Sequence, residues 1–309
     1  MYGGGNMSKI AFLYPGQGSQ YVGMAKDLYE NNEEAKKYFE NIFESIDLDL
    51  KETMFNGPEE KLKETKYTQP AIVAMSLVLT RLLEEKGVKA DYVAGHSLGE
   101  YSAIGATKML SLEETVKLAV KRGDIMNKVA SEVNGTMAAI IGLDSDKINE
   151  VLKSIDGVVE AVNYNEPKQT VIAGEIESIN KACEALKNAG AKRALVLPVS
   201  GPFHSSLMKP AGEELKKYLD TLNFHKGEIK LLANTSLDFI DESESLKEEL
   251  YKQTFGPVRW VETIEKLKAE GVTEFYEIGP GKVLKGLVKK IDKELNLINI
   301  EKIEDLNQI

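Results

Sequence analysis

The pentapeptide GHSLG at residues 95–99 restricts the fold of this chain more than any other stretch. It matches the pattern G-x-S-x-G and stands between a predicted short strand, 92–94, and helix-like sequence. In that setting a Cβ atom in place of either glycine would collide with the neighbouring strand or helix, so the pattern is typical of a sharp strand-to-helix turn. The turn exposes Ser97 at a helix N-terminus, where free N–H groups favour an oxyanion. The pattern therefore predicts a nucleophilic serine; the alternative is an incidental turn.

Strands and helices alternate around this turn and again towards the end of the chain. Such alternation predicts an α/β-hydrolase-like core with a mainly parallel sheet. The expected elements are strands over 9–14, 92–94 and 273–278, and helices over 24–29, over 33–43, from Pro70 to a stop at Gly87, and from Ser111, in a capping box with Glu114, to about Lys128.

The middle of the chain has a different order of elements. Strands over 135–142, 158–163, 170–173 and 193–198 and helices over 145–155 and 176–189 give the order βαββαβ, the signature of a ferredoxin-like unit. We therefore expect a discontinuous α/β core, 1–131 and 200–309, with an inserted ferredoxin-like subdomain, 132–199. The active site is expected in the cleft between these two bodies. Residues 1–6 precede a second possible start at Met7 and are interpreted as an added leader.

Charge and cysteine content exclude several classes of partner. The formal net charge is −10 and the pI about 5.1, which disfavours a general attraction to nucleic acid. No apolar run approaches the roughly 20 residues that cross a bilayer, and the N-terminus lacks the layout of a signal peptide. The single cysteine, Cys183, cannot form an intramolecular disulfide, which fits a reducing compartment. We expect a cytoplasmic protein without a membrane partner.

A nucleophilic serine needs a base, and the chain has three histidines. His96 adjoins Ser97, so its side chain should point away from the exposed hydroxyl, and His225 lies in a polar loop. Elimination leaves His204, in a stiff turn after the inserted unit, as general base; the alternative is a hydrogen-bonded structural histidine. No Asp or Glu stands out as a third member, and a backbone carbonyl or an amide side chain could equally orient the base.

The turn GQG at residues 16–18 follows the first predicted strand. If the strands are parallel, this turn lies at the same sheet end as Ser97. Its glycines would let the Gln17 N–H approach a ligand closely, and with the Leu98 N–H it would form an oxyanion hole. The alternative is a simple strand-exit turn, and a third glycine for a dinucleotide fingerprint is missing.

Four ordered motifs together resemble the malonyl-CoA:acyl carrier protein transacylases of bacterial fatty acid synthesis. They are PGQGSQ at 15–20, GHSLGEYSA at 95–103, PFHSSLM at 202–208 and EIGPGKVL at 277–284. The resemblance runs from about Lys9 to Lys290. It implies a malonyl group transferred through an acyl ester on Ser97, with His204 as base and the Gln17 and Leu98 amides as oxyanion hole.

The same resemblance implies roles for five further residues. Arg122 matches the arginine that pairs with the free malonyl carboxylate, a task that suits a planar guanidinium. The main-chain carbonyl of Gln253 matches the group that orients the histidine. Asn163 and Asn165 match positions that line the cleft, and Phe203 resembles the residue that narrows the pocket.

The implied reaction is a two-step exchange between malonyl-CoA and acyl carrier protein, with no metal and no other cofactor, carried out by a monomer. Because the carrier protein is acidic like this chain, its binding needs a local basic patch. The candidates are Lys192, Arg193, Lys209, Lys282, Lys285, Lys289 and Lys290. The alternatives are a malonyl acyltransferase acting in trans in a polyketide pathway, a serine hydrolase or thioesterase sharing the serine turn, and an inactive scaffold.

Overall fold

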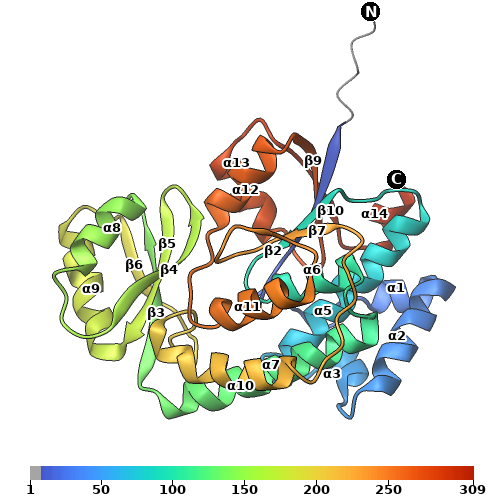
Figure 1. Cartoon of the computed structure of the whole chain (residues 1–309), viewed down its shortest axis with the longest axis horizontal. Coiled ribbons are helices and arrows are strands. Elements are labelled where there is room, and N and C mark those ends of the chain that lie inside the picture. The colour runs from blue at the N-terminus through green and yellow to red at the C-terminus, as the bar shows by residue number, and fades with distance from the viewer. Residues whose placement is uncertain (1–7) are drawn as a thin grey trace, which may run out of the picture.

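The structure is a computed structural model that describes residues 8–309. Residues 1–6, for which the sequence suggested a leader, lie outside the described residues. Figure 1 shows a larger body of helices around one sheet and a smaller body beside it, formed by the middle of the chain. Each body has its own sheet, with six strands in the larger one and four in the smaller one.

The large sheet has the strand order β10-β9-β1-β2-β7-β8. All neighbours are parallel except β7 and β8, which form an antiparallel edge. The mainly parallel sheet predicted from the sequence is therefore confirmed. Its strands are β1 (Lys9–Tyr14), β2 (Tyr92–Gly95), β7 (Lys230–Leu232), β8 (Phe239–Ile240), β9 (Val272–Ile278) and β10 (Asn296–Ile300).

Side chains along the central strand β1 alternate between the two faces of this sheet, as the pleat requires. Phe12 and Tyr14 join the core under α5, α6 and α7, whereas Ala11 and Leu13 join a second core under α12 and α13. The sheet is thus covered by helices on both faces, which matches the nearly continuous apolar run of its central strand β1.

The helices of the large body come from both ends of the chain. They are α1 (Lys26–Asn31), α2 (Glu33–Ser45), α3 (Leu50–Asn56), α4 (Glu59–Leu62), α5 (Thr65–Glu85), α6 (Gly99–Thr107), α7 (Leu112–Glu132), α10 (Lys209–Leu219) after a short 3-10 turn (Ser206–Met208), α11 (Ser243–Gln253), α12 (Trp260–Ala269), α13 (Val283–Ile291) and α14 (Ile303–Asn307). The predicted capping box of Ser111 and Glu114 is present.

One predicted boundary is wrong. Pro70 does not begin α5, which starts at Thr65 and carries Pro70 in its interior. A proline there removes the hydrogen bond to the carbonyl four residues earlier. That residue, Lys66, is exposed, so water can satisfy its carbonyl and the helix tolerates the proline.

The small body contains β3 (Gly135–Ile141), α8 (Ser145–Leu152), β4 (Val159–Glu166), β5 (Gln169–Glu175), α9 (Ile176–Asn188) and β6 (Arg193–Val196). Its sheet has the order β4-β5-β3-β6, with antiparallel neighbours throughout. Strand β4 meets the large body at Val258, whose N–H donates to the Val162 carbonyl at 2.7 Å. Its carbonyl accepts the Tyr164 N–H at 3.0 Å. Within residues 8–309, no helix is long and apolar enough to cross a membrane.

Candidate active site

The turn between β2 and α6 has the tight geometry that the glycines predict. A Cβ on Gly95 would lie 1.9 Å from the Gly99 carbonyl oxygen, and a Cβ on Gly99 would lie 2.1 Å from the Tyr14 carbonyl oxygen. Neither position can hold a side chain without moving the backbone. Ser97 itself has φ 54, a left-handed conformation that is costly for a residue with a Cβ and is common at functional sites.

Ser97 and His204 lie together although 107 residues separate them. The Ser97 Oγ is 2.7 Å from His204 Nε2, and His204 Nδ1 is 2.8 Å from the main-chain carbonyl oxygen of Gln253. Because a carbonyl only accepts, Nδ1 carries the proton and Nε2 is left as the acceptor for the serine hydroxyl. The arrangement is that of a nucleophile, a base and a group that orients the base.

The His204 imidazole is held in its neutral form. Burial, followed by the positive charge of Arg122, lowers the pKa of His204 to about 3. A neutral imidazole can accept the serine proton near neutral pH. His204 also has a positive φ, 68, so both members of the pair are fixed in uncommon backbone conformations by the fold around them.

Among the backbone N–H groups of residues 96–99, only that of Leu98 lacks an internal acceptor within the described chain. The N–H groups on either side of it are taken: Ser97 donates to Asn234 Oδ1 at 2.9 Å, and Gly99 donates to the His96 carbonyl at 2.9 Å. The Leu98 N–H at the start of α6 is therefore available to an oxyanion.

The loop that holds Gln17 packs directly on this turn. A Cβ on Gly16 would lie 2.6 Å from the His96 carbonyl oxygen and 3.8 Å from the Leu98 nitrogen. The close approach requires glycine and brings the Gln17 backbone beside Leu98. In residues 8–309 the Gln17 N–H has no acceptor either, so the residue after Gly16 offers a second free donor on the loop that packs on the serine turn.

Arg122, on α7, is 3% exposed and forms no ion pair with the described residues. Its guanidinium donates to Gln69 Oε1 at 3.1 Å and to Gln253 Oε1 at 3.2 Å, and it lies over the Tyr101 ring at 4.9 Å from the centroid. A buried cation held only by neutral groups is costly unless an anion pairs with it. A carboxylate ligand would compensate this burial.

Asn165 of the small body bonds the residue that precedes Ser97. Asn165 Oδ1 lies 2.6 Å from His96 Nε2, and the His96 ring packs against Trp260, 5.4 Å between centroids. The partners of the His96 ring are thus Asn165 and Trp260. Asn163 pairs with Val258 through the backbone, and its Oδ1 has no partner among the described residues.

Phe203 precedes the base and lies between the two bodies. Its half-buried ring packs against the core of the large body and against the open face of the small sheet, where Val171 and Ala173 lie. It therefore lies at the junction that the sequence predicts for the cleft.

Two polar residues at the site were missed in the sequence. Gln69 holds Arg122 from α5, and Asn234 accepts the Ser97 N–H from the loop after β7. Neither belongs to a motif. The only available signal for Asn234 was a polar residue directly after an apolar strand, which is where α/β proteins place site residues.

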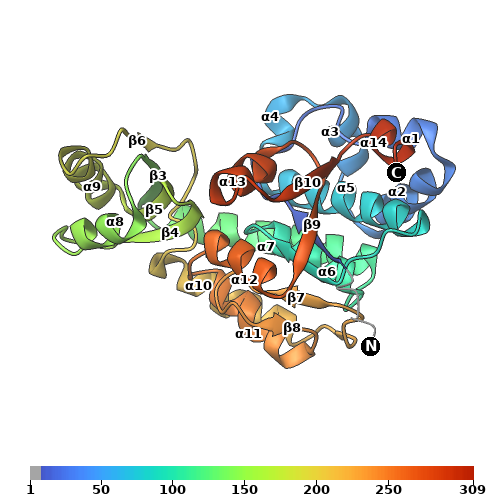
Figure 2. The ribbon, with the colours of Figure 1, turned by 90° about the horizontal axis from the view of Figure 1, so that it is seen from above.

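The remaining sequence candidates lie on the surface. The basic residues of the expected patch are exposed and form no ion pair within residues 8–309: Lys192, Arg193, Lys209, Lys282, Lys285, Lys289 and Lys290. Four of them lie on helix α13 or directly before it: Lys282, Lys285, Lys289 and Lys290. This helix packs against β4 of the small body (Figure 2).

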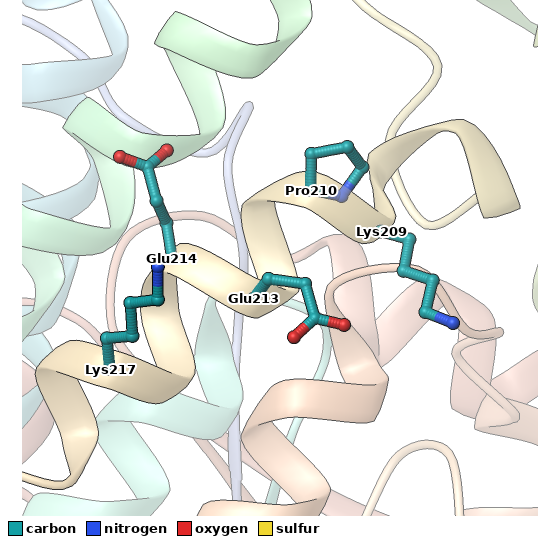
Figure 3. A pocket seen from close by; sticks show the side chains of 5 residues that line it. All are labelled: Lys209, Pro210, Glu213, Glu214 and Lys217. Atoms are coloured by element: carbon teal, nitrogen blue, oxygen red, sulfur yellow. The ribbon is translucent and has the colours of Figure 1, made fainter.

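A hollow on the surface of α10 lies apart from the Ser97–His204 pair. It is lined by Pro210 and by four charged side chains of successive turns (Figure 3): Lys209, Glu213, Glu214 and Lys217. They diverge from one helix and do not converge on a point, so it is not the chemical site. No cluster of three or more metal-ligating side chains occurs in residues 8–309.

Comparisons with known proteins agree with this geometry. Residues 11–303 match the acyl transferase domain family. The chain is 44% identical to the malonyl CoA-acyl carrier protein transacylase of Bacillus subtilis, over 97% of this chain and 96% of that one. It is 42% identical to the protein of the same name from Staphylococcus aureus, with 97% and 98% covered. The predicted family resemblance is thus confirmed.

Solved structures give the same result. An acyl carrier protein S-malonyltransferase from Vibrio cholerae is similar with a TM-score of 0.94 and 40% identity, covering 97% of this chain and 99% of that chain. A malonyl-transacylase solved in complex with a type II PKS acyl-carrier protein also has a TM-score of 0.94, with 38% identity and 97% and 98% covered.

Proposed function

Because the chain belongs to the acyl transferase domain family, we propose that it transfers a malonyl group from malonyl-CoA to the phosphopantetheine thiol of acyl carrier protein, for fatty acid synthesis. The protein is an acyltransferase. One observation supports the malonyl substrate above all: the Ser97–His204 pair shares Gln253 with Arg122, a buried cation that has no carboxylate partner in the described chain.

In the first half-reaction Ser97 attacks the thioester carbonyl of malonyl-CoA while its proton passes to His204 Nε2, 2.7 Å away. The negative charge that develops on the carbonyl oxygen is held by the Gln17 and Leu98 N–H groups. The carbon–sulfur bond then breaks, and the coenzyme A thiolate takes the proton from His204. The product is a malonyl ester on Ser97.

In the second half-reaction the carrier-protein thiol gives its proton to His204 and attacks the ester through the same oxyanion. The Ser97 oxygen leaves and recovers the proton. A thioester is formed for each thioester consumed, so the chain's own residues supply all the proton transfers, and we propose that no metal or other cofactor takes part.

Selectivity for malonyl over acetyl groups is assigned to Arg122. Gln69 and Gln253 hold the guanidinium from two sides through its Nη1 and Nη2 atoms, and Tyr101 covers one face. An acetyl group would leave this cation unpaired, whereas a malonyl carboxylate compensates its burial. Asn163, Asn165 and Phe203 are proposed to line the remaining cleft.

The same proposal includes the division of the chain. We assign 1–131 and 200–309 to an α/β-hydrolase-like core and 132–199 to an inserted ferredoxin-like subdomain. The strand order β4-β5-β3-β6 and the element order βαββαβ support the second assignment. The protein is proposed to act as a monomer, and in the cytoplasm, where its single cysteine stays reduced.

One alternative is favoured by a specific observation. The malonyl-transacylase with a TM-score of 0.94 was solved with a polyketide carrier protein, so the acceptor can belong to a polyketide pathway with the same chemistry. Comparing rates with the two kinds of carrier protein separates these readings.

The transfer itself is tested by intact mass after brief exposure to malonyl-CoA. We expect a single malonyl adduct that is absent in Ser97→Ala and is discharged by holo acyl carrier protein. Free malonate without an adduct would instead favour a hydrolase. No reaction in the wild-type protein would contradict the substrate class.

A further inference from the structure

The loop after β7 lies beside the turn that carries Ser97. Strands β2 and β7 are parallel neighbours, with Val93 opposite Leu231. Parallel strands end at the same sheet edge, so Asn234 and Ser97, which follow these strands at similar distances, meet there. The contact depends on the pairing of the two strands and not on proximity in the sequence.

The Asn234 side chain bridges the two ends of the turn. Its Oδ1 accepts the Ser97 N–H at 2.9 Å, and its Nδ2 donates to the Gly95 carbonyl at 2.6 Å. Asn234 is completely buried, so water cannot replace these bonds. A single amide therefore fixes the peptide groups on both sides of His96.

These bonds hold Ser97 in its left-handed conformation. While Asn234 binds the Ser97 N–H, Gln253 Nε2 donates to the Ser97 carbonyl at 2.8 Å. Both polar backbone groups of the strained residue thus have side-chain partners. Occupation of the Ser97 N–H also leaves the next one, that of Leu98, as the free donor of the turn.

Asn234 is itself fixed from several sides. Its N–H donates to Glu100 Oε2 at 2.8 Å, and its carbonyl accepts the Arg259 N–H at 3.0 Å. The next two N–H groups, of Thr235 and Ser236, donate to buried Glu249 at 3.2 and 2.9 Å. The amide has no freedom to follow a moving turn, so it determines where the turn lies.

We propose that Asn234 is a positioning residue for acyl transfer: it fixes the Ser97 backbone so that the hydroxyl meets His204 and the Leu98 N–H remains free for the oxyanion. This inference rests on the proposed function, because it takes Ser97 as the nucleophile. Loss of the Asn234 amide should slow the chemical step and change malonyl-CoA binding little, since Asn234 bonds the turn directly and is linked to Arg122 only through a long, 3.4 Å bond from Gln253 Nε2.

The test is single-turnover malonylation of Ser97, followed by rapid quench and intact mass over a range of malonyl-CoA concentrations. Asn234→Ala and Asn234→Leu remove both bonds, the second with little change in volume. Asn234→Asp keeps an oxygen for the Ser97 N–H but loses the donor to Gly95. Asn299→Ala is the control, because it removes an amide that bonds buried Glu277 at the distant β10 edge.

We expect the limiting rate to fall about 10- to 100-fold in Asn234→Ala and Asn234→Leu, with the half-saturating malonyl-CoA concentration within about twofold of wild type. Asn299→Ala should have a lower melting temperature than the wild-type protein but the same limiting rate of malonylation. Wild-type rates in the Asn234 variants would overturn the proposal. So would a rate loss in Asn299→Ala as large as that in an Asn234 variant with the same melting temperature. If Asn234→Ala and Asn234→Leu do not fold, a wild-type rate in Asn234→Asp overturns it. Failure of the wild-type protein to form an adduct would contradict the proposed function instead.

Discussion

The Nδ1–H of His204 donates to the main-chain carbonyl of Gln253 at 2.8 Å, while the opposite ring nitrogen lies 2.7 Å from Ser97 Oγ. A neutral carbonyl thus occupies the place that a carboxylate has in a Ser-His-Asp triad. It fixes the tautomer and the ring orientation but adds no negative charge to stabilise an imidazolium. The base of this site therefore stays neutral until the proton transfer begins.

The pH dependence of acylation should reflect this neutral base. Burial and the Arg122 charge lower the pKa of His204 to about 3, so the imidazole that must accept a proton remains unprotonated well below its ordinary pKa of about 6.5. We expect the rate of malonyl loading to stay level between about pH 5 and 8. Quenched loading with circular dichroism at each pH checks this, and a decline centred near pH 6.5 in folded protein would contradict it.

Arg122→Ala should separate the two acyl groups. The variant removes the partner of the malonyl carboxylate, a loss of about 2 kcal/mol or more, which corresponds to at least about 30-fold in loading by malonyl-CoA. Loading by acetyl-CoA should not fall, because no buried cation is left unpaired. Loading is followed by mass with each substrate, and Lys121→Ala, an exposed neighbour on α7, serves as control. An equal loss with both substrates would assign Arg122 to the fold and not to selectivity.

Gly16→Ala should damage the oxyanion hole. Its Cβ would lie 2.6 Å from the His96 carbonyl oxygen, so the loop must move and take the Gln17 N–H away from the site. We expect malonyl loading to slow by about 100-fold, the usual effect of losing one oxyanion donor. Gly286→Ala is the control, since a Cβ there meets nothing within 4 Å. Unchanged loading in Gly16→Ala would argue that Gln17 takes no part.

Charge reversal on α13 should weaken only the second half-reaction. Lys285→Glu with Lys289→Glu places negative charge beside β4, where an acidic carrier protein would approach, and we expect its KM to rise about 10-fold. Loading by malonyl-CoA should be unchanged. The control pair, Lys86→Glu with Lys89→Glu, lies at the amino end of β2. If both half-reactions decline together, or the control behaves alike, the surface is not the docking site.

Local patterns in the sequence were sufficient wherever a short motif carried the information. The serine turn was predictable because a side chain in place of either of its glycines would clash with the backbone of α6 or β1. The start of α7 was predictable because Ser111 and Glu114 form a capping box within one turn. The start of α5 was not, since the effect of Pro70 depends on whether water reaches the carbonyl it leaves free.

The sequence by itself determined the alternation of strands and helices, the nucleophile turn and, by elimination among three histidines, the candidate base. Only the tertiary structure decided which neutral groups surround these residues. Gln69 and Asn234 come from different elements, and no spacing relates them to Ser97 or Arg122. The Gln253 carbonyl was expected from the family resemblance, but the bonds of the Gln253 side chain to Arg122 and to the Ser97 carbonyl were not. Their roles follow from strand pairing and burial, because a buried amide must find its partners in three dimensions, wherever the fold brings them.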